Sequence, residues 1–566
     1  MTKAIASVLA AAFFLAFGSL NHAAAQEAAF DINRIQVEGN TILPTQTVEA
    51  LVAPFAGKGK VYGDVQKSLE ALENEYRRLG YGTVQVYVPE QELTGGVVRL
   101  VVSEGVIGKV TITGNKNFNE ENVRAGLPEL KEGTPPNMRK LSENVQLSNE
   151  NPAKQVEVTL GVSEEEGKVN ARIDVREEDP DRFYVTLDNT GTRGSGYARL
   201  GFSYQNSNMF NKDQVLTLAY TTAVDPPGRM KVFGHRVFPW DEGKGVEVDI
   251  YSIGYRLPLY ALGDSIDFIY ANSSTNTPST GDLGALGTLG INGKGEIWGL
   301  RYNHIFPRAG EYSSRLVLAY DRKYLDNTCD LPGVASSKLL YANNLATAGC
   351  TPYTIQPVSV TYSGQWQKPG ESIDFYLTAA QNIATGADYV WPLTGKDDNY
   401  SGASGYKVRD DFSAVRVGGS YFAVFGGDWL FRFAANAQYS HSALPVTERF
   451  GLAGWTTVRG FNERAVSTDR GHVVNFEVYT PDMATSFGLP GTLKWLAFID
   501  SAQGTNVGPS LKVGIASVGV GLRYNLKKDI SARFDVAQVV DGYSPPGNNV
   551  QPEGSVRGHV GVAFGF

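Results

Sequence analysis

The segment Val458-Arg459-Gly460-Phe461 carries the side chain best suited to a strong, directional contact in this chain. Arginine stays charged at any physiological pH, and its donors form a rigid fork that matches a carboxylate. Two carboxylates follow, one at Glu477 and one in Phe498-Ile499-Asp500. We predict a bidentate pair between Arg459 and Asp500 that holds a loop in one position, with Glu477 as the competing partner. The alternative is an exposed loop arginine with its head in water.

No catalytic arrangement accompanies this pair. The six histidines are scattered, and none lies in a His-Glu-x-x-His pattern. Gly194-Ser195-Gly196 lacks the form of a nucleophile elbow, and the sequence has no phosphate-binding GxxxxGK loop. Cys329 and Cys350, without a nearby histidine, would fill only half of a tetrahedral metal shell, so we expect one loop disulfide in an exported protein. The sequence therefore predicts no enzyme, no metal site and no cofactor, and its net charge of −8 argues against a nucleic-acid partner.

The elements that must position Arg459 and Asp500 are β-strands. From Arg182 onward, stretches of about 8–12 residues alternate between apolar and small or polar side chains, which is typical of a transmembrane barrel. Short and long connections between them also alternate, as periplasmic turns and extracellular loops do. We predict roughly 16 antiparallel strands and expect Met230–Phe238 to form a hairpin arm in an extracellular loop. A soluble β-sandwich is the alternative, but its loops need not alternate in length.

Strand faces place the predicted pair inside this barrel. The strand that leads into Asp500 points Phe498 and Asp500 into the lumen, because successive side chains of a strand alternate. Phenylalanine is unusual in a watery lumen, so we expect something to pack against it. Folding the long connection 443–470 back into the barrel would bring Phe461 to Phe498 and Arg459 to Asp500.

The residues before the barrel are typical of a leader and two small repeated modules. Residues 1–25 have the positive start, the apolar run and the small-residue end of a signal peptide. Residues 26–104 and 105–178 each contain a strand that ends in Gly-Asn, then helices, then further strands. This repeat predicts two α+β domains, with a chance turn match inside one α+β domain as the alternative. The predicted helices cover 64–79, 119–127 and 138–147.

In these motifs and their order, the chain resembles the transporters of two-partner secretion, members of the superfamily of polypeptide-handling outer-membrane barrels. The tandem modules look like periplasmic POTRA domains. Val458-Arg459-Gly460-Phe461 matches the family's VRG-aromatic loop signature, and Phe498-Ile499-Asp500 matches its Phe-x-Asp strand motif. Phe564 and Phe566 match the aromatic end that the barrel-assembly machinery reads during biogenesis.

The resemblance implies a transporter in the Gram-negative outer membrane, surrounded by lipid, with its POTRA domains in the periplasm. It would take one large, unfolded, β-rich secreted protein from the periplasm and export it through the barrel pore without nucleotide hydrolysis. Several members plug the pore with an N-terminal helix; only a few residues precede the first strand after the predicted cleavage site, so we expect none here. A barrel-assembly factor is the alternative, although it usually carries more than two POTRA modules. A diffusion porin would leave residues 30–178 without a purpose.

Overall fold

The computed structural model describes most of the chain. The predicted signal peptide and the predicted disulfide between Cys329 and Cys350 lie outside the described residues. No helix in the described part is long and apolar enough to cross a membrane. The chain divides into two compact units, and the second contains the whole barrel together with residues 111–130 and 139–159. The described residues are 29–566 except 192–195, 225–230, 233–234, 237–247, 275–278, 283–287, 292–294, 326–352, 385–409, 508–511, 528 and 544–550.

The first module packs two helices against a three-stranded sheet of order β2-β5-β4, with β2 parallel and β4 antiparallel to β5. One face of α3 fills the core with Val65, Leu72 and Tyr76, because residues three and four apart lie on one side of a helix. Helix α2 was not predicted from the sequence, since it is short and buries only Val48 and Val52. The elements are β1 (Phe30–Ile32), β2 (Arg34–Glu38), α2 (Thr45–Val52), η1 (Ala53–Phe55), β3 (Gly57–Lys60), α3 (Tyr62–Arg78), β4 (Val84–Tyr87), η2 (Thr94–Gly96) and β5 (Val97–Glu104).

The second module repeats the plan with a sheet of order β6-β8-β7. In both modules the first strand of the sheet ends at a glycine with a positive φ angle, 81° at Gly39 and 87° at Gly114. A Cβ at these positions would lie only 2.3 Å and 2.2 Å from a carbonyl oxygen of a neighbouring strand. Glu104 and Glu177 each accept the backbone N–H two positions after that glycine, at 2.8 Å and 2.9 Å. The predicted repeat is thus present as two matched turns. The elements are β6 (Val106–Thr113), α4 (Glu120–Ala125), α5 (Met138–Asn149), β7 (Lys154–Val162) and β8 (Lys168–Glu177).

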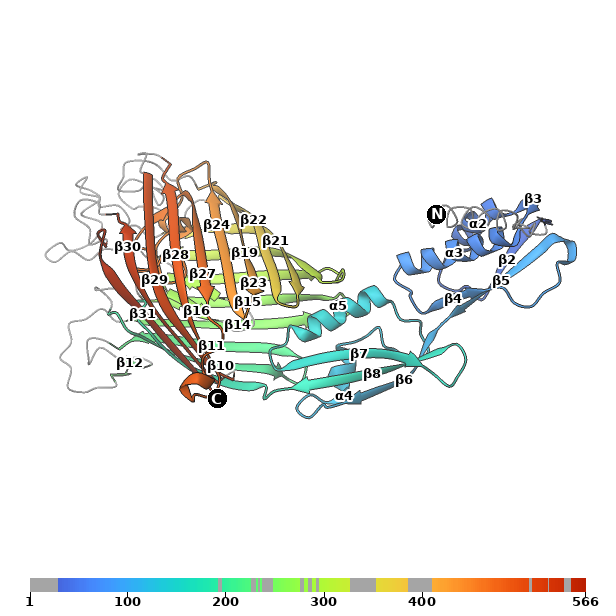
Figure 1. Ribbon diagram of the computed structural model, residues 1–566, viewed down its shortest axis with the longest axis horizontal. Coiled ribbons are helices and arrows are strands. Elements are labelled where there is room, and N and C mark those ends of the chain that lie inside the picture. Colours follow the sequence, from blue (N-terminus) through green and yellow to red (C-terminus); the bar gives the residue numbers. More distant parts are fainter. Residues whose placement is uncertain are drawn as a thin grey trace, which may run out of the picture. The chain divides into compact units, whose positions relative to one another are not determined.

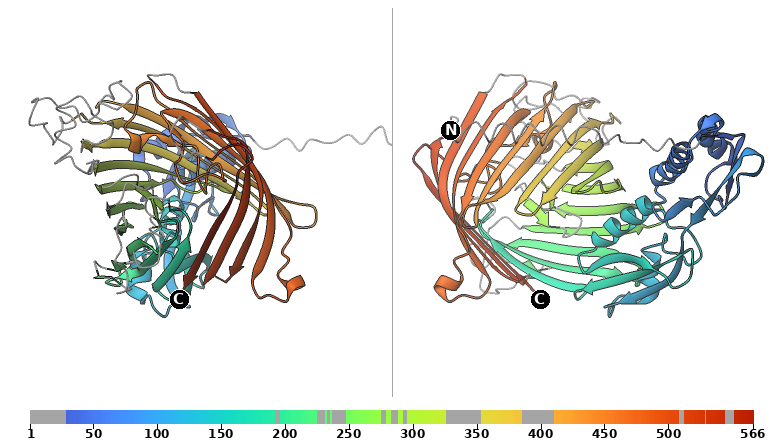
Figure 2. Two further views of the ribbon diagram at one scale, coloured as in Figure 1. Left: turned by 90° about the vertical axis from the view of Figure 1, so that its left-hand side faces the viewer. Right: turned by 45° about the vertical axis from the view of Figure 1, so that its right-hand side comes forward.

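Sixteen antiparallel strands of the described chain close into a barrel, as predicted, with β9 pairing to both β10 and β31. The count treats β20 and β21 as one interrupted strand, since both pair with β19. The strands lie side by side (Figure 1) and curve round the barrel (Figure 2). They are β9 (Asp181–Asp188), β10 (Arg199–Met209), β11 (Gln214–Ala223), β14 (Asp249–Leu259), β15 (Asp264–Ser273), β18 (Gly295–Ile305), β19 (Tyr312–Leu325), β20 (Tyr353–Ile355), β21 (Pro357–Lys368), β22 (Glu371–Asn382), β23 (Ser413–Phe425), β24 (Trp429–Tyr439), β27 (Arg470–Tyr479), β28 (Thr492–Thr505), β29 (Lys512–Leu526), β30 (Ile530–Asp541) and β31 (Val556–Gly565).

Alternate residues of the wall point outward and inward. In β28, Trp495 and Ile499 are exposed on the outside, whereas Phe498 and Asp500 are buried inside. Apolar residues face outward because lipid surrounds such a barrel. Within Met230–Phe238, the described residues form a short antiparallel pair outside the barrel order, which agrees with the expected hairpin. The smaller elements are β12 (Lys231–Val232), β13 (His235–Arg236), β16 (Ser279–Asp282), β17 (Thr288–Ile291) and η5 (Thr485–Phe487).

Candidate functional site

The long connection between β24 and β27 packs against inward-facing side chains of the barrel wall. Val458 and Phe461 are fully buried and share one apolar cluster with residues of β27, β28, β29 and β30. The loop therefore lies inside the barrel, where the strand faces predicted it. The wall residues of this cluster are Val473, Ala502, Val513, Ile515 and Val539. Within the loop are η4 (Val446–Glu448), β25 (Phe450–Gly451) and β26 (Ser467–Thr468).

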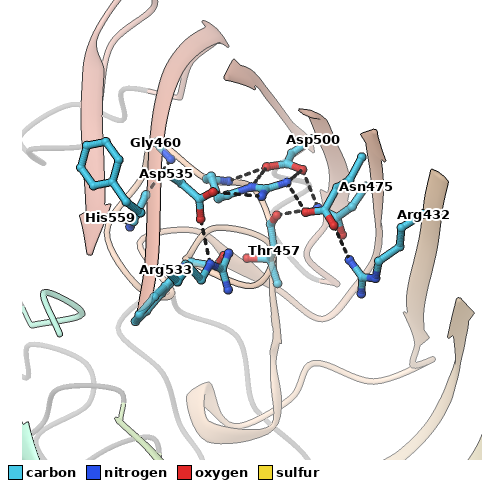
Figure 3. Close-up of polar contacts among 12 residues, drawn as sticks. Arg432, Thr457, Gly460, Asn475, Asp500, Arg533, Asp535 and His559 are labelled. Atoms are coloured by element: carbon cyan, nitrogen blue, oxygen red, sulfur yellow. Dashed lines mark hydrogen bonds and ion pairs between the residues drawn. The ribbon is translucent and has the colours of Figure 1, made fainter. Parts of the chain in front are cut away.

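At the tip of this loop, Arg459 is 1% exposed and faces three carboxylates. Two of them, Asp500 and Asp535, are labelled in Figure 3. Its Nε and Nη2 donate to the two oxygens of Asp500 at 2.7 Å and 2.8 Å, and its backbone N–H donates to Asp500 at 3.1 Å. Nη2 also lies 2.8 Å from Oε1 of Glu477, and Nη1 lies 3.8 Å from Oδ1 of Asp535. We call these four residues the tip anchor. The structure brings Arg459 to Asp500 and Glu477 together, so the two acids are joint partners rather than competitors.

An aromatic ring covers the guanidinium of the tip anchor. Cζ of Arg459 lies 3.4 Å from the centroid of the Phe498 ring, which is the arrangement of a cation–π contact. The structure does not bring Phe461 to Phe498: Phe461 belongs to the loop cluster, whereas Phe498 packs with Leu496 and Ala537. Arg459 is therefore what packs against the inward-facing phenylalanine, and the expected pairing of the two rings was wrong.

Gly460 allows the loop tip to approach the wall closely. Its φ is 96°, and a Cβ on it would lie 3.2 Å from Val539 and 3.4 Å from Ala537. Its N–H donates to Nε2 of His559, on the last strand, at 3.0 Å. Sequence reasoning assigned no role to His559 or to Asp535. Their inward position in the alternation of β30 and β31 was the only signal, and many other residues share it.

A cavity of about 250 Å³ lies beside the tip anchor. Besides Arg459, it is lined by Arg432, which donates to Glu477 at 3.0 Å. Two further arginines in its lining each donate to Asp535 at 2.8 Å. Four guanidiniums thus share three carboxylates around a polar space large enough for water. The two further arginines are Arg523 and Arg533.

Arg459 stays protonated and positively charged among these carboxylates. Burial alone would lower the pKa of Arg459, but the hydrogen bonds and charge of Asp500, together with Glu477 and Asp535, outweigh burial and raise it. The state of the anchor therefore depends on the contacts of the guanidinium, not on its protonation. In the part of the chain that the structure describes, no cluster of His, Cys, Asp and Glu could hold a metal ion.

The predicted assembly signal lies where the first and last strands close the barrel. The backbone N–H of Phe183 donates to the carbonyl of Phe566 at 2.9 Å, and the N–H of Phe566 donates back at 3.0 Å. The two rings stack with centroids 6.2 Å apart. Phe564 and Phe566 are both exposed on the outer face, and their reading by the assembly machinery stays a prediction.

Comparisons with known families match this architecture segment by segment. Residues 30–105 match the family described as "POTRA domain, ShlB-type", and residues 105–186 match "Surface antigen variable number repeat", a POTRA family. Residues 372–524, which include Arg459, Glu477 and Asp500, match "Haemolysin secretion/activation protein ShlB/FhaC/HecB". The chain belongs to the two-partner secretion transporter family.

Relatives extend the match over nearly the whole transporter. The outer membrane transporter CdiB of Dickeya dadantii (strain 3937) is 23% identical over 96% of this chain and 88% of its own length. The heme/hemopexin transporter protein HuxB of Haemophilus influenzae is 19% identical over 90% of this chain and 84% of its own. The solved structure of CdiB from Escherichia coli shares the fold, with a TM-score of 0.68, 19% identity and coverage of 98% and 93% of the two chains.

These findings confirm the predicted fold class, a 16-stranded barrel preceded by two POTRA domains, and the predicted outer-membrane location. The protein is an outer-membrane transporter of two-partner secretion that exports exoproteins, and it is not an enzyme.

Proposed function

We propose that this two-partner secretion transporter exports one dedicated, large, β-rich protein, and that the loop carrying Arg459 closes its pore at rest. The tip anchor is the observation that carries the proposal. A single arginine fastens the loop to β27, β28 and β30 from inside the barrel. Releasing that one side chain breaks the ion pairs of the loop tip to three strands at once, which suits a gate.

We assign residues 26–104 and 105–178 as the two POTRA domains that bind the exoprotein, ahead of the barrel at 179–566. In the first module, β2 and β4 form the two ends of the sheet. Glu73 already accepts the backbone N–H of Val86 on β4 at 3.2 Å, so the edge at β2 is the better place for an added strand. An unfolded, extended segment of the exoprotein satisfies that edge with its own backbone.

Export in this scheme uses no nucleotide. The exoprotein crosses unfolded and folds outside the cell, and its folding makes the transfer irreversible. The outer-membrane lipids and, during biogenesis, the barrel-assembly machinery are the other partners of the transporter.

The test compares a strain that has this transporter with a strain that lacks it, by proteomics of the culture medium and of the outer membrane. We expect one large protein to disappear from the medium while other outer-membrane barrels stay at their normal level. Loss of many barrels from the membrane would instead establish a barrel-assembly factor. In the same strain, deletion of residues 30–103 should abolish export and leave a conducting pore in a planar bilayer.

A further inference from the structure

A second buried carboxylate holds the same loop at its base. Glu448, in η4, is 5% exposed. Its Oε1 accepts from Nζ of Lys323 on β19 at 2.7 Å, and its Oε2 accepts from Nη2 of Arg416 on β23 at 2.8 Å. Each oxygen of one carboxylate thus binds a cation from a different strand.

Hydrogen bonds to the backbone and apolar packing also attach the base of the loop to the barrel wall. The carbonyl of Glu448 accepts from Nε2 of Gln438 at 3.0 Å, and Gln438 accepts in turn from Arg416 at 2.7 Å. Leu444 is fully buried in a cluster with wall residues of the same side of the barrel. The members of that cluster are Leu325, Ile355, Phe412 and Leu444. We call Glu448, Lys323 and Arg416 the root anchor.

The strand order shows which parts of the barrel wall the two anchors use. The order from β19 runs β21, β22, β23, β24, β27, β28, β29, β30, so β30 is eight strands from β19 in a closed barrel of sixteen. These two strands therefore face each other across the lumen. The root anchor includes β19 and the tip anchor includes β30, through Asp535. The root anchor also uses β23, which lies two strands from β27 of the tip anchor, so the loop is fastened to two neighbouring but separate groups of strands by anchors that share no residue.

We propose that Glu448 is a positioning residue that fixes the base of the loop to β19 and β23, and that the exoprotein passes only after Glu448 has released Lys323 and Arg416. The inference rests on the proposed function, in which the loop closes the pore. It adds a second, separate step to opening, because a loop freed only at its tip is still held at its base to β19 and β23.

The decisive measurement is single-channel recording of the full-length transporter in planar bilayers. Glu448→Gln removes the buried carboxylate that Lys323 and Arg416, both partly exposed, share, and we expect it to raise the ratio of open to closed time at least tenfold. Glu553→Gln, the same change in an exposed loop residue, should leave the ratio unchanged. A ratio for Glu448→Gln equal to that of the wild type would overturn the proposal. If this variant fails to assemble, Lys323→Gln, which keeps the pair with Arg416, must show a smaller rise in the same direction.

A crosslink tests the release step directly. In a background of Cys329→Ser and Cys350→Ser, the pair Glu448→Cys and Arg416→Cys is joined by a short bismaleimide, with each single cysteine variant treated as the control. We expect export to fall at least tenfold only in the joined protein, and unchanged export would show that the base need not move.

Arg459→Ala is measured beside these variants, so that a failure of the gating loop can be told apart from a failure of the root anchor. If Arg459→Ala leaves export and conductance unchanged, the gating loop of the proposed function is wrong. If Arg459→Ala impairs export while the Glu448 variants and the crosslink are silent, only the second anchor is wrong.

Discussion

Two buried cations hold different parts of this transporter, and their surroundings differ. Lys154, at the start of β7, is fully enclosed and pairs with Asp213 in the turn between β10 and β11. It also donates to Asn122 at 3.0 Å, and the hydroxyl of Tyr260 donates to Asp213 at 2.6 Å. Arg459 is almost as buried, but it holds a loop and lies beside the cavity of about 250 Å³.

The surroundings decide which contact can be released. When Arg459 leaves, Glu477 keeps Arg432, and Asp535 keeps Arg523 and Arg533, next to a space with room for water. Asp500 keeps a hydrogen bond from the side-chain amide of Asn475 at 2.7 Å. In the part of the chain that the structure describes, Lys154 has one ion-pair partner. Separating Lys154 from Asp213 would leave both buried charges without a counter-charge, with only Asn122 and the hydroxyl of Tyr260 as hydrogen-bond partners. Burial alone therefore does not make a contact permanent; the availability of water and other partners matters as much.

Removing the enclosed cation should have the largest effect on stability. Lys154→Met leaves Asp213 unpaired in the interior, and breaking such a pair costs ~3–5 kcal/mol. Hydrogen exchange of peptides from 111–130 and 139–159 should speed up accordingly. Lys168→Met, which removes a partner from the exposed pair with Glu165, should cost less than about 1 kcal/mol. Hydrogen exchange at wild-type rates in Lys154→Met would show that the contact between Lys154 and Asp213 does not stabilise these segments.

Acid should weaken the root anchor. Burial alone would raise the pKa of Glu448, but Lys323 and Arg416 lower it to about 2. Because the folded pKa lies below the ordinary value, the stabilisation is fully present above about pH 4.5 and is lost as the pH falls through about 2. Arg464 also faces this carboxylate. The stabilisation at stake is about 3 kcal/mol.

The measurement is the fraction of heat-modifiable, folded barrel between pH 6 and pH 2.5, for the wild type and for Glu448→Gln. The variant should start less stable and lose less with acid, so that the two profiles converge. Parallel profiles would show that Glu448 does not titrate with unfolding.

Removing Arg459 should lower the free energy of unfolding less than removing Lys154 does, but it should reduce export more. Arg459→Ala should destabilise the barrel by about 2 kcal/mol, below the cost at Lys154, because Glu477 and Asp535 keep other arginines and Asp500 keeps the hydrogen bond from Asn475. Export should fall at least tenfold while the barrel stays folded and heat-modifiable. Arg308→Ala, in an exposed turn, is the matched control. Unimpaired export in Arg459→Ala would show that anchoring of the loop does not matter for transport.

The smallest expected difference in export is between variants of the two acids that bind Arg459. Asp500 accepts three hydrogen bonds from Arg459, whereas Glu477 also serves Arg432 and Tyr479. Asp500→Asn should therefore reduce export about threefold more than Glu477→Gln, a difference below 1 kcal/mol. Secretion assays on the two variants measure this directly, and the reverse order would make Glu477 the main partner.

Local patterns in the sequence were enough to predict the wall and one charged contact. Alternation along single strands showed that Phe498 and Asp500 face inward, and the turn pattern showed that the connections differ in length at the two ends. With Arg459 in a long loop, the pairing to Asp500 followed. The Gly-Asn turns similarly predicted the repeated modules, because an unusual backbone angle at Gly39 and Gly114 requires a particular residue.

The remaining contacts depend on how the barrel closes and on how its loop folds inside. Asp535 and His559 reach the loop tip only because β30 pairs with β29 and β31, and β31 closes the barrel on β9. Glu448 meets Lys323 only because the loop base crosses to a strand more than a hundred residues earlier. A strand's alternation tells which side chains face the lumen but not which of them meet, since that depends on register and closure summed over sixteen strands.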